Sequence, residues 1–316
     1  MDWYVQGTKP NYFYVGPKSA PAVDEERIFL GDDQGIFYAL RQSDGSVLWS
    51  KKILFGAKGK YIFSSPVVCD DLVYFGSYDG NVYALNKETG ATEWVFMEAD
   101  WVGSSPAIAA DKGLLFIGLE FGLIKKRGGV AALDLKTGQK RWEFIMPEYT
   151  HASPGYSSKY GVVGIGSNDG VFYLFEASTG KLFWQLKTGG EIKYGCSFDE
   201  KRGLVAFGSF DSKLYVVSVK TGVIAFTHDT NASIYSTPFI YEDMLYVTSL
   251  DKRIYALNLD TGKVSWEFLT GGRIFASPWI FNNHLYVGSN DGRLYELDLQ
   301  GRETGLFQLM ELFCLN

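Results

Sequence analysis

A motif that recurs about every 40 residues constrains the fold of this chain more than any other feature. Its clearest copies begin at Ser64-Ser65-Pro66 and at Ser236-Thr237-Pro238. Self-similarity at a fixed period of roughly 20–50 residues is typical of proteins built from one repeated structural unit. The proline position of the motif recurs at intervals of 45, 40, 48, 44, 40 and 40 residues, at Pro21, Pro66, Pro106, Pro154, Phe198, Pro238 and Pro278.

Each repeat is predicted to contain four short β-strands. Runs such as 72–76 and 285–288 are apolar or alternating, as expected of strands buried between neighbouring units. Asp-Gly pairs at 79–80, 169–170 and 291–292 separate two such runs and indicate tight hairpin turns. The composition agrees, because 20 Tyr and 23 Phe favour strands while 36 Gly supply turns. Four-stranded units of this length are typical of the blades of a β-propeller.

An aromatic residue stands four positions after the glycine of Asp44-Gly45 and of the Thr-Gly pairs that end at 90, 138, 180, 222 and 262. These residues are Trp49, Trp94, Trp142, Trp184, Phe226 and Trp266. A ring that recurs once per unit is best explained by packing between neighbouring blades, because one blade cannot bury its own faces. The predicted fold is therefore all-β, a seven-bladed β-propeller of four-stranded antiparallel blades.

The string Tyr-x-Leu-[Asn/Asp]-x-x-Thr-Gly-x-x-x-Trp, as in residues 83–94, resembles the repeat of the pyrroloquinoline-quinone (PQQ-like, or quinoprotein) propellers. Copies of it, most with substitutions at one or more positions, recur at least six times and cover almost the whole chain. The resemblance implies a propeller in a single domain over residues 1–316. Blades are expected to start near positions 16, 61, 101, 149, 193, 233 and 273.

The last repeat lacks the closing tryptophan, so the chain offers two strands for the outer position of blade 7. The distance from Trp3 to the first motif proline is 18 residues, close to the 17 that separate Trp49 from the second. We expect residues 1–8 to close the ring as this outer strand, which leaves no mismatched seam. The alternative is residues 305–309, with Trp3 capping an edge. In the first arrangement residues 305–316 form an apolar tail, either packed on the ring or used for docking.

The positions five and three residues before the motif proline vary between repeats and carry aromatic and basic side chains. The position between them is mostly aliphatic, so strand alternation would place the variable pair on the opposite face. Rings beside cationic groups can hold a planar or anionic ligand, or a peptide. A water-filled channel rim with no ligand is the alternative. The predicted ligand- or partner-binding residues at this channel mouth are Tyr61, Phe63, Trp101, Tyr149, His151, Lys193, Tyr235, Arg273 and Phe275.

Two loops interrupt the period. Residues 119–129 enlarge a hairpin of the third blade by about six residues, and residues 51–60 lengthen the connection between the first two blades. Insertions on a rigid scaffold often carry binding. Lys125, Lys126 and Arg127 in the first insertion are therefore predicted to bind an acidic partner. Solvated loops without a role are the alternative.

Sequence patterns for catalysis or metal binding are missing. Three histidines, His151, His228 and His284, fall in different repeats at no ligand spacing, and no zinc, Walker or EF-hand motif is present. The quinone-dependent enzymes of the resembling family have eight blades, a calcium ion and an adjacent cysteine pair. This chain has seven repeats and no adjacent cysteines. We expect no catalytic residue, no metal and no cofactor; a PQQ- and calcium-dependent dehydrogenase is the alternative.

The expected function is that of a non-catalytic binding or scaffold propeller, which presents its channel mouth and rim to a protein, a peptide or a small ligand. The resemblance supports this expectation, because the family includes non-enzymatic sensor and assembly proteins. An architectural domain of a larger enzyme or sensor is a further alternative.

Charge and hydropathy limit the surroundings in which such a module works. A net charge of −6 argues against a nucleic-acid partner. No run approaches the roughly 18 apolar residues of a membrane span. The N-terminal sequence lacks the pattern of a signal peptide, and three distant cysteines suggest reduced thiols. A cytoplasmic location is therefore expected.

Overall fold

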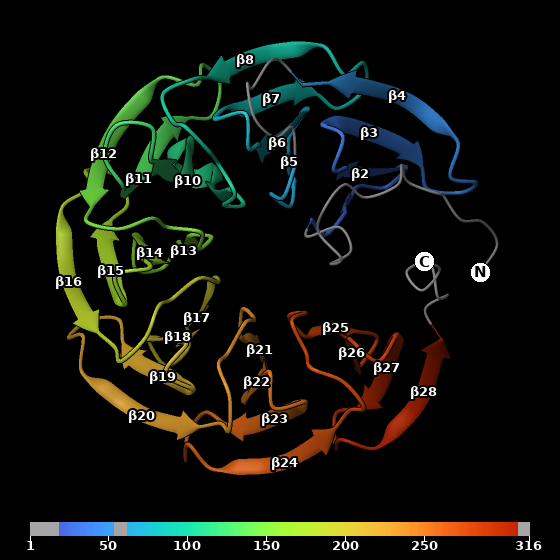
Figure 1. The fold of residues 1–316 in the computed structure, drawn as a ribbon, viewed down its shortest axis with the longest axis vertical. Coiled ribbons are helices and arrows are strands. Elements are labelled where there is room, and N and C mark those ends of the chain that lie inside the picture. Colours follow the sequence, from blue (N-terminus) through green and yellow to red (C-terminus); the bar gives the residue numbers. More distant parts are fainter. Residues whose placement is uncertain (1–18, 54–61, 309–316) are drawn as a thin grey trace. The chain divides into compact units, whose positions relative to one another are not determined.

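The computed structural model describes residues 19–53 and 62–308, which form seven four-stranded antiparallel sheets (Figure 1). The strands of each sheet are neighbours in sequence order, so each sheet is built from one repeat. A short 3-10 helix, η1 (Ala110–Lys112), is the only helix among the described residues. This is the arrangement of blades that the repeat predicted.

Each sheet contains one short strand followed by three longer ones. The first three sheets consist of β1 (Ala22–Val23), β2 (Arg27–Gly31), β3 (Ile36–Arg41) and β4 (Val47–Lys52); β5 (Val67–Cys69), β6 (Leu72–Gly76), β7 (Val82–Asn86) and β8 (Thr92–Phe96); and β9 (Ala107–Ala109), β10 (Leu114–Phe121), β11 (Arg127–Asp134) and β12 (Lys140–Met146). The fourth and fifth consist of β13 (Gly155–Ser157), β14 (Val162–Gly166), β15 (Val171–Glu176) and β16 (Leu182–Lys187); and β17 (Cys196–Asp199), β18 (Leu204–Gly208), β19 (Lys213–Ser218) and β20 (Ile224–Asp229). The last two consist of β21 (Phe239–Tyr241), β22 (Met244–Thr248), β23 (Arg253–Asn258) and β24 (Val264–Leu269); and β25 (Trp279–Phe281), β26 (His284–Ser289), β27 (Arg293–Asp298) and β28 (Glu303–Gln308).

The two middle strands of each sheet carry most of the core. β6 and β7 are buried along almost their whole length, and Phe75 of β6 stacks on Phe37 of β3 with ring centroids 4.0 Å apart. The fourth strand of a sheet, such as β24, instead alternates between half-buried and exposed residues. Middle strands lose the alternation because sheets cover both of their faces, whereas the fourth strand keeps one face in water.

The chain divides into two compact units, which are described separately. The first unit comprises Met1–Val163 and Phe175–Lys181, and the second comprises Gly164–Leu174 and Leu182–Asn316. The first three sheets belong to the first unit and the last three to the second, while the fourth sheet contributes to both.

The hydroxyl residues of the motif link neighbouring sheets within each unit. The Ser65 amide donates to the Ser105 hydroxyl at 2.9 Å, and the Ser105 amide donates to the Ser153 hydroxyl at 3.0 Å. In the second unit, the Thr237 amide donates to the Ser277 hydroxyl at 2.9 Å. Each hydroxyl thus satisfies a main-chain donor of the preceding repeat, which explains why a small hydroxyl residue recurs before the proline.

The same hydrogen bonds correct the register of the fifth repeat. The Gly195 amide donates to Oγ1 of Thr237 at 3.0 Å, so Gly195 takes the place of the second serine of the motif. Cys196, not Phe198, therefore takes the place of the proline. The fully buried Ile192 agrees, because it fills the aliphatic position four residues earlier. The predicted register was wrong by two residues because this repeat has no Ser-Pro pair and only spacing could guide the alignment.

The recurring aromatic residue packs against the next sheet, which confirms its predicted role. The Trp94 indole donates to the Leu135 carbonyl at 2.9 Å, and the Trp184 indole donates to the Val219 carbonyl at 2.7 Å. Each ring lies against the glycine of the next Thr-Gly turn. A Cβ at Gly138, whose φ is +69°, would lie 2.6 Å from the Trp94 ring. Glycine therefore permits both the left-handed turn and the close approach of the indole.

The fourth strand of the seventh sheet is β28, which pairs antiparallel with β27. This strand corresponds to the alternative, residues 305–309, that the sequence analysis gave for the outer position. Residues 305–308 are therefore part of a strand and not of the predicted apolar tail. The expected closing segment 1–8, with Trp3, lies outside the described residues, as do residues 309–316.

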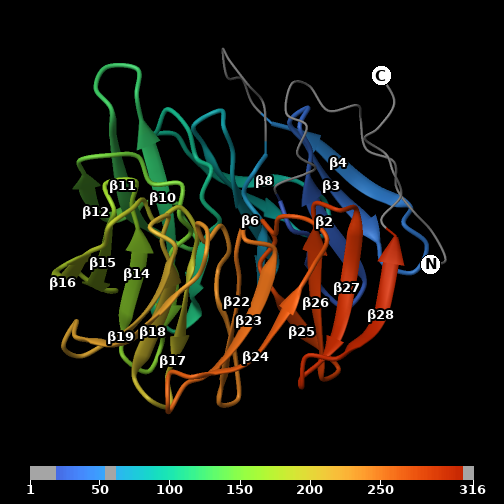
Figure 2. The same cartoon turned by 60° about the horizontal axis from the view of Figure 1, so that its bottom comes forward.

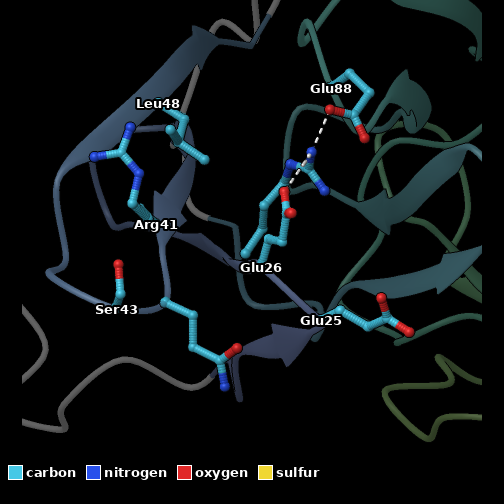
Figure 3. A pocket seen from close by; sticks show the side chains of 8 residues that line it. Glu25, Glu26, Arg41, Ser43, Leu48 and Glu88 are labelled. Carbon is cyan, nitrogen blue, oxygen red and sulfur yellow. Dashed lines mark hydrogen bonds and ion pairs between the residues drawn. The ribbon is translucent and has the colours of Figure 1, made fainter.

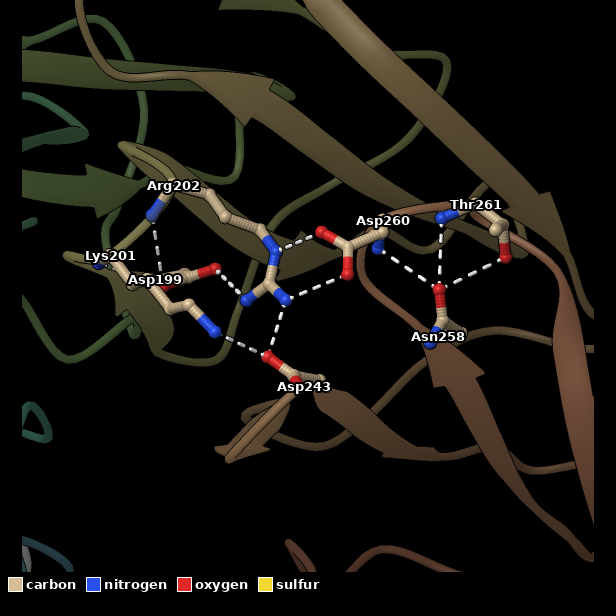
Figure 4. A network of polar contacts seen from close by, with 7 residues as sticks. All are labelled: Asp199, Lys201, Arg202, Asp243, Asn258, Asp260 and Thr261. Atoms are coloured by element: carbon tan, nitrogen blue, oxygen red, sulfur yellow. Dashed lines mark hydrogen bonds and ion pairs between the residues drawn. The ribbon is translucent and has the colours of Figure 1, made fainter.

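A charge network joins the fifth and sixth sheets (Figure 4). The Arg202 guanidinium contacts the carboxylates of Asp199 at 3.0 Å, Asp243 at 2.5 Å and Asp260 at 2.5 Å. Lys201 adds a contact of 2.8 Å to Asp243. Hydrogen bonds from Lys201 and Arg202 lower the pKa of Asp243 to about 2, and the three carboxylates raise the pKa of Arg202. Because each of its cations contacts carboxylates from the neighbouring sheet, this network is a structural link between sheets.

Candidate functional site

The predicted channel-mouth residues lie on connections between sheets rather than on strands. The first strand of each sheet begins after the motif proline, so the positions before it belong to the segment that arrives from the preceding sheet. The middle position is buried as predicted, with exposures of 1% for Ile62 and 0% for Val102 and Thr150. The physical reason differs from strand alternation: Ile62 packs against Gly31, and Val102 packs against Gly76. The expected placement on a strand was therefore wrong.

Four predicted residues come together in the first unit. The rings of Trp101 and Tyr149 are perpendicular, with centroids 6.3 Å apart, and the His151 ring lies 6.1 Å from that of Tyr149. Lys126 Nζ lies 4.9 Å from the Tyr149 centroid and 2.7 Å from the Glu148 carboxylate. The structure thus joins three channel-mouth residues to one residue of the basic loop. Trp101, Lys126, Tyr149 and His151 are called the hairpin cluster below.

A glycine of the enlarged hairpin makes room for this cluster. A Cβ at Gly122 would lie 2.3 Å from the Tyr149 hydroxyl and 2.5 Å from the Trp101 ring. The main chains of Trp101 and Glu120 form an isolated antiparallel bridge, with N–O distances of 3.2 and 3.0 Å. The hairpin insertion at 119–129 and the connection that carries Trp101 are therefore one structural feature, although the sequence analysis treated them as two separate sites.

Glu120 is a residue of this site that the sequence analysis missed. Its side chain is 3% exposed, and its Oε1 lies 3.1 Å from Nδ1 of His151. This contact does not count as a hydrogen bond, so Oε1 has no hydrogen-bond partner within the described part of the chain. Burial and the charge of Glu120 raise the pKa of the neighbouring Tyr78. Burying a carboxylate is costly unless it has a partner, so His151 is the side chain on which Glu120 depends.

A second aromatic group forms in the second unit. The Tyr235 ring stacks on Phe210 with centroids 4.2 Å apart. It also contacts Phe275 edge-on at 5.2 Å and Tyr194 at 5.5 Å. Lys193 Nζ lies 5.0 Å from the Phe210 centroid. All five side chains are half-buried. Lys193, Tyr194, Phe210, Tyr235 and Phe275 are called the Tyr235 cluster below.

The remaining predicted residues lie outside these clusters. Phe63 meets Tyr78 edge-on, with ring centroids 4.8 Å apart. Arg273 is exposed, and its carbonyl accepts a hydrogen bond from the Asn290 amide at 3.0 Å. Tyr61 lies outside the described residues. The structure therefore groups the predicted residues by unit; Phe63 contacts Tyr78, the neighbour of Glu120, and Arg273 belongs to neither named cluster.

The basic side chains of both clusters already have acidic partners. Lys193 lies 2.7 Å from the Glu191 carboxylate, and Lys126 lies at the same distance from Glu148. Stacking on exposed ring surface, rather than net positive charge, is therefore the main means of recognition that these clusters offer.

Tyr78, Phe210 and Glu120 occupy equivalent positions in their repeats. In the second and fifth repeats this position is the middle residue of a Ser-x-Asp turn, as in Ser209-Phe210-Asp211. In the third repeat β10 extends through it, which places Glu120 there. The signal was present in the sequence, because the residue between the constant serine and aspartate changes from repeat to repeat. Aligning these turns would have marked Tyr78 and Phe210 as a variable position, but not their contacts, and the third repeat has no such turn to place Glu120.

Two surface hollows lie away from the predicted residues. The first, of about 580 Å³, is lined by Glu25, Glu26, Arg27, Arg41, Gln42, Ser43, Leu48 and Glu88 (Figure 3). The second, of about 490 Å³, is lined by Tyr241, Glu242, Met244, Tyr246, Ser265, Trp266, Leu299 and Gln300. In the first, the Arg27 guanidinium is paired with Asp24 at 3.1 Å and with Glu88. Within the described residues, neither Ser43 of the first hollow nor Ser265 of the second hydrogen-bonds to a carboxylate. Across residues 19–53 and 62–308, no three His, Cys, Asp or Glu side chains are grouped to hold a metal ion.

Comparison with known proteins relates the repeats to one family. The family PQQ_2, described as outer membrane protein assembly factor BamB, matches residues 3–155 and 168–305. The chain belongs to this family. No curated protein matches its sequence.

A solved structure shares the fold of this PQQ_2 chain. The crystal structure of BamB from Moraxella catarrhalis superposes with a TM-score of 0.73 at 19% identity, over 95% of this chain and 88% of that chain. The fold is a β-propeller, and the seven four-stranded sheets are its blades. Among the described residues, no helix has the length and apolar character needed to span a membrane.

The chemistry that these clusters offer to the PQQ_2 propeller is recognition. They supply half-exposed aromatic rings, two cations with acidic partners and one buried carboxylate. Aromatic rings with a polar edge bind peptides and proteins through large contact area at low entropic cost. Because the rings sit on connections tied to buried aliphatic residues, they are held in place before a partner arrives.

Proposed function

We propose that this propeller is a non-catalytic scaffold that binds partner proteins or peptides, with the hairpin cluster of the first unit and the Tyr235 cluster of the second as separate binding surfaces. The description of the family as an assembly factor and the likeness to BamB support a role in protein–protein assembly. An enzymatic role has no comparable support, because neither cluster pairs a nucleophile with a base.

The observation that carries the proposal is the Tyr235 cluster. Its rings stack on one another at the surface, although aromatic side chains in the same repeats, such as Phe207 and Tyr215, are buried in the sheets. Folding of the sheets alone gives no reason for four half-exposed rings, three on connections between sheets and Phe210 in the turn between β18 and β19. Aromatic residues that gather in this way are enriched at the centres of protein interfaces.

The buried residue that precedes each variable residue explains how the rings are held at the surface. The buried Ile192 and Ile234 anchor the connections that carry Lys193 and Tyr235. A connection fixed by a buried anchor loses little further conformational freedom when a partner binds. The constant part of the repeat thus serves folding, and the variable part serves binding.

Affinity capture with matched variants tests the proposal. The tagged full chain is expressed in its native host as wild type, Tyr235→Ala, Trp101→Ala and Phe183→Ala, and the captured proteins are quantified by mass spectrometry. Phe183 on β16 is 55% exposed and lies outside both clusters, so it controls for the loss of any exposed ring. We expect the cluster variants to reduce recovery of the specific partners about tenfold or more. Unchanged recovery in both cluster variants, or an equal loss in Phe183→Ala, would contradict the proposal.

A ligand titration tests the non-catalytic part separately. Pyrroloquinoline quinone with calcium is added to the purified chain, and thermal stability and tryptophan fluorescence are followed. A ligand that binds only the folded state raises its stability by mass action. We expect no shift at saturating quinone. Micromolar binding that is lost in Trp101→Ala would instead identify a cofactor site and a redox enzyme.

We also propose that the protein works in the cytoplasm. Its described cysteines, Cys69 and Cys196, are free thiols, which is usual in a reducing compartment. Burial raises the pKa of Cys69, which disfavours the reactive thiolate. Cell fractionation with a compartment-specific thiol label checks this proposal, and labelling only by a reagent confined to an extracytoplasmic compartment would overturn it.

A further inference from the structure

The enlarged hairpin of the third sheet ends in an exposed apolar tip. Residues 122–126 connect β10 to β11, and this connection stands at the end of its sheet (Figure 2). Leu123 is 77% exposed and Ile124 is fully exposed at 102%. Lys125, Lys126 and Arg127 follow directly and are exposed as well. Two adjacent aliphatic side chains at an apex, followed by three cations, differ from the isolated apolar residues that are normal on a protein surface.

The base of the hairpin holds this tip in position. Oδ2 of Asp100 accepts hydrogen bonds from the amides of Gly122 at 2.7 Å and Leu123 at 2.9 Å. The Arg127 guanidinium lies 4.8 Å from the centroid of Phe121, across the first pair of the hairpin. With both ends of the connection fixed, the Leu123 and Ile124 side chains stay directed away from the sheet.

The shape of the tip favours a lipid surface over a protein partner. A stable protein interface buries about 800 Å² on each partner, which two protruding side chains cannot supply. A bilayer needs no complementary pocket, because apolar groups enter the region below the headgroups while nearby cations contact anionic lipid. Trp101 and Tyr149 lie at the base of the tip, and amphipathic rings of this kind favour the headgroup level.

The local charge is consistent with anionic lipid. Three cations lie at the tip itself. The carboxylates of Asp100, Glu120 and Glu148 lie at its base, where Glu120 contacts His151 and Glu148 pairs with Lys126. The tip is therefore positive within a chain whose net charge is −6. Because the rest of the surface is repelled by an anionic membrane, charge as well as hydropathy directs this hairpin toward it.

We propose that the tip of the β10–β11 hairpin, Leu123 and Ile124 with Lys125, Lys126 and Arg127, is a peripheral binding element for membranes that contain anionic phospholipid. The two aliphatic side chains enter the bilayer interface, and the cations contact the lipid phosphates. Binding is weak and reversible, with an association constant on the order of 10³–10⁴ M⁻¹, comparable with that of a single myristoyl chain. This element shares Lys126 with the hairpin cluster and shares no residue with the Tyr235 cluster.

Co-sedimentation of the full chain with vesicles tests the proposal. One set of vesicles contains phosphatidylcholine alone, and the other contains about one third phosphatidylserine. The variants are Leu123→Ser/Ile124→Ser and Lys125→Ala. Matched controls remove an exposed apolar side chain and an exposed cation elsewhere, as Phe183→Ser and Lys220→Ala.

We expect the wild-type chain to bind the anionic vesicles more tightly than the neutral ones. The double serine variant should bind at least about tenfold more weakly, and Lys125→Ala about fivefold more weakly. Both controls should bind as the wild type does. No binding to anionic vesicles, or equal losses in the tip variants and their controls, would overturn the proposal.

Combining the two assays separates this proposal from the scaffold function. Tyr235→Ala should keep its vesicle binding, and the double serine variant should keep its captured partners. If the serine variant instead lost its partners while vesicle binding stayed absent throughout, the tip would be part of a protein interface.

Discussion

The aspartate of the Ser-x-Asp turn, which lies between the second and third strands of a sheet, hydrogen-bonds to three segments at once. Oδ2 of Asp251 accepts the Tyr255 hydroxyl at 2.6 Å and the Asn231 amide at 2.9 Å, while Oδ1 accepts the Arg253 amide at 3.0 Å. One carboxylate thus orders the turn, the strand that follows it and the connection that arrives from the preceding sheet. The same arrangement recurs at Asp211 and Asp291.

Replacing Asp251 should therefore destabilise the fold strongly. Asp251→Ala leaves the Tyr255 hydroxyl and two amides without this acceptor, and we expect the free energy of unfolding to fall by about 2–4 kcal/mol. Urea denaturation measures the loss. Asp229→Ala serves as the control, because this carboxylate is 71% exposed and, among the described residues, forms an ion pair only with Lys213; its effect should stay within about 1 kcal/mol. Equal effects of the two variants would show that the turn network is not structural.

His228 gives the fold a dependence on pH. Its ring contacts Tyr255 edge-on at 4.9 Å, and its Nε2 makes no hydrogen bond within the described residues. Burial lowers the pKa of His228, although the nearby charges of Asp229, Asp251 and Glu267 act in the opposite direction. Because the pKa is lower in the folded than in the unfolded state, the stability is fully present above about pH 6.5. It is lost as the pH falls through the folded pKa.

Removing this histidine should flatten the acid side of the stability profile. The free energy of unfolding of His228→Gln should fall less between neutral pH and about pH 5 than that of the wild type. Chemical denaturation at several pH values measures the difference. His284→Gln is the control, since His284 lies near the surface and its Nδ1 already contacts the Asn282 carbonyl at 2.9 Å. If the free energy of unfolding of His228→Gln fell with pH as much as that of the wild type, burial of this ring would not be the cause of the loss of stability in acid.

Neighbouring sheets within a unit are joined by hydroxyl residues on the connection before the first strand and by an aromatic ring on the fourth strand. The ring position holds Trp184 in the fourth sheet and Phe226 in the fifth, and each packs against the glycine of the next turn. Only the indole adds a hydrogen bond, to the Val219 carbonyl. In the fifth sheet, therefore, the ring packs against the next turn without donating a hydrogen bond.

Exchanging the two aromatic residues should separate packing from hydrogen bonding. Trp184→Phe should lower the free energy of unfolding by about 1 kcal/mol or more, because it removes the donor to Val219 and some buried area. Phe226→Trp should be neutral or stabilising by up to about 1 kcal/mol, because its indole can reach the equivalent Leu259 carbonyl. Thermal unfolding of both variants tests this. Destabilisation of similar size in both would mean that ring shape alone matters.

The strands and their packing could be predicted from the sequence because the repeat fixes them many times over. The recurring Trp and Thr-Gly predicted the contact between sheets, and the structure confirms it at Trp94 and Trp184. The fifth repeat could not be aligned, because Gly195-Cys196 replaces the Ser-Pro pair and leaves no marker. Glu120 was missed for a related reason: its burial depends on β10 extending past the point where other repeats turn.

The candidate site was predicted only in part. Varied aromatic and basic residues correctly suggested that the positions before the motif proline differ from the core, and Trp101, Tyr149 and His151 do lie together. Their partners Phe210 and Glu120 come from a different turn. Contacts between separate segments of a repeat follow from the fold, so spacing along the chain could not reveal them.

For the molecule as a whole, the repeat separates positions that hold the sheets together from positions that vary. Constant hydroxyl, glycine and indole residues make the contacts between sheets, whereas the variable residues gather in the hairpin cluster and the Tyr235 cluster. Binding surfaces on such a scaffold can change without disturbing the core, because variable residues carry little of the packing. The specificity of this protein should therefore reside in its connections.

Photo-crosslinking in the cell tests most directly whether a partner contacts the Tyr235 cluster. A benzophenone amino acid replaces Phe275 in the cluster or, as the control, Phe183 on β16. We predict discrete crosslinked species from position 275 that are absent from position 183 and that disappear when Tyr235→Ala is added. No crosslinks from position 275, or the same crosslinks from both positions, would contradict a partner-binding role for this cluster.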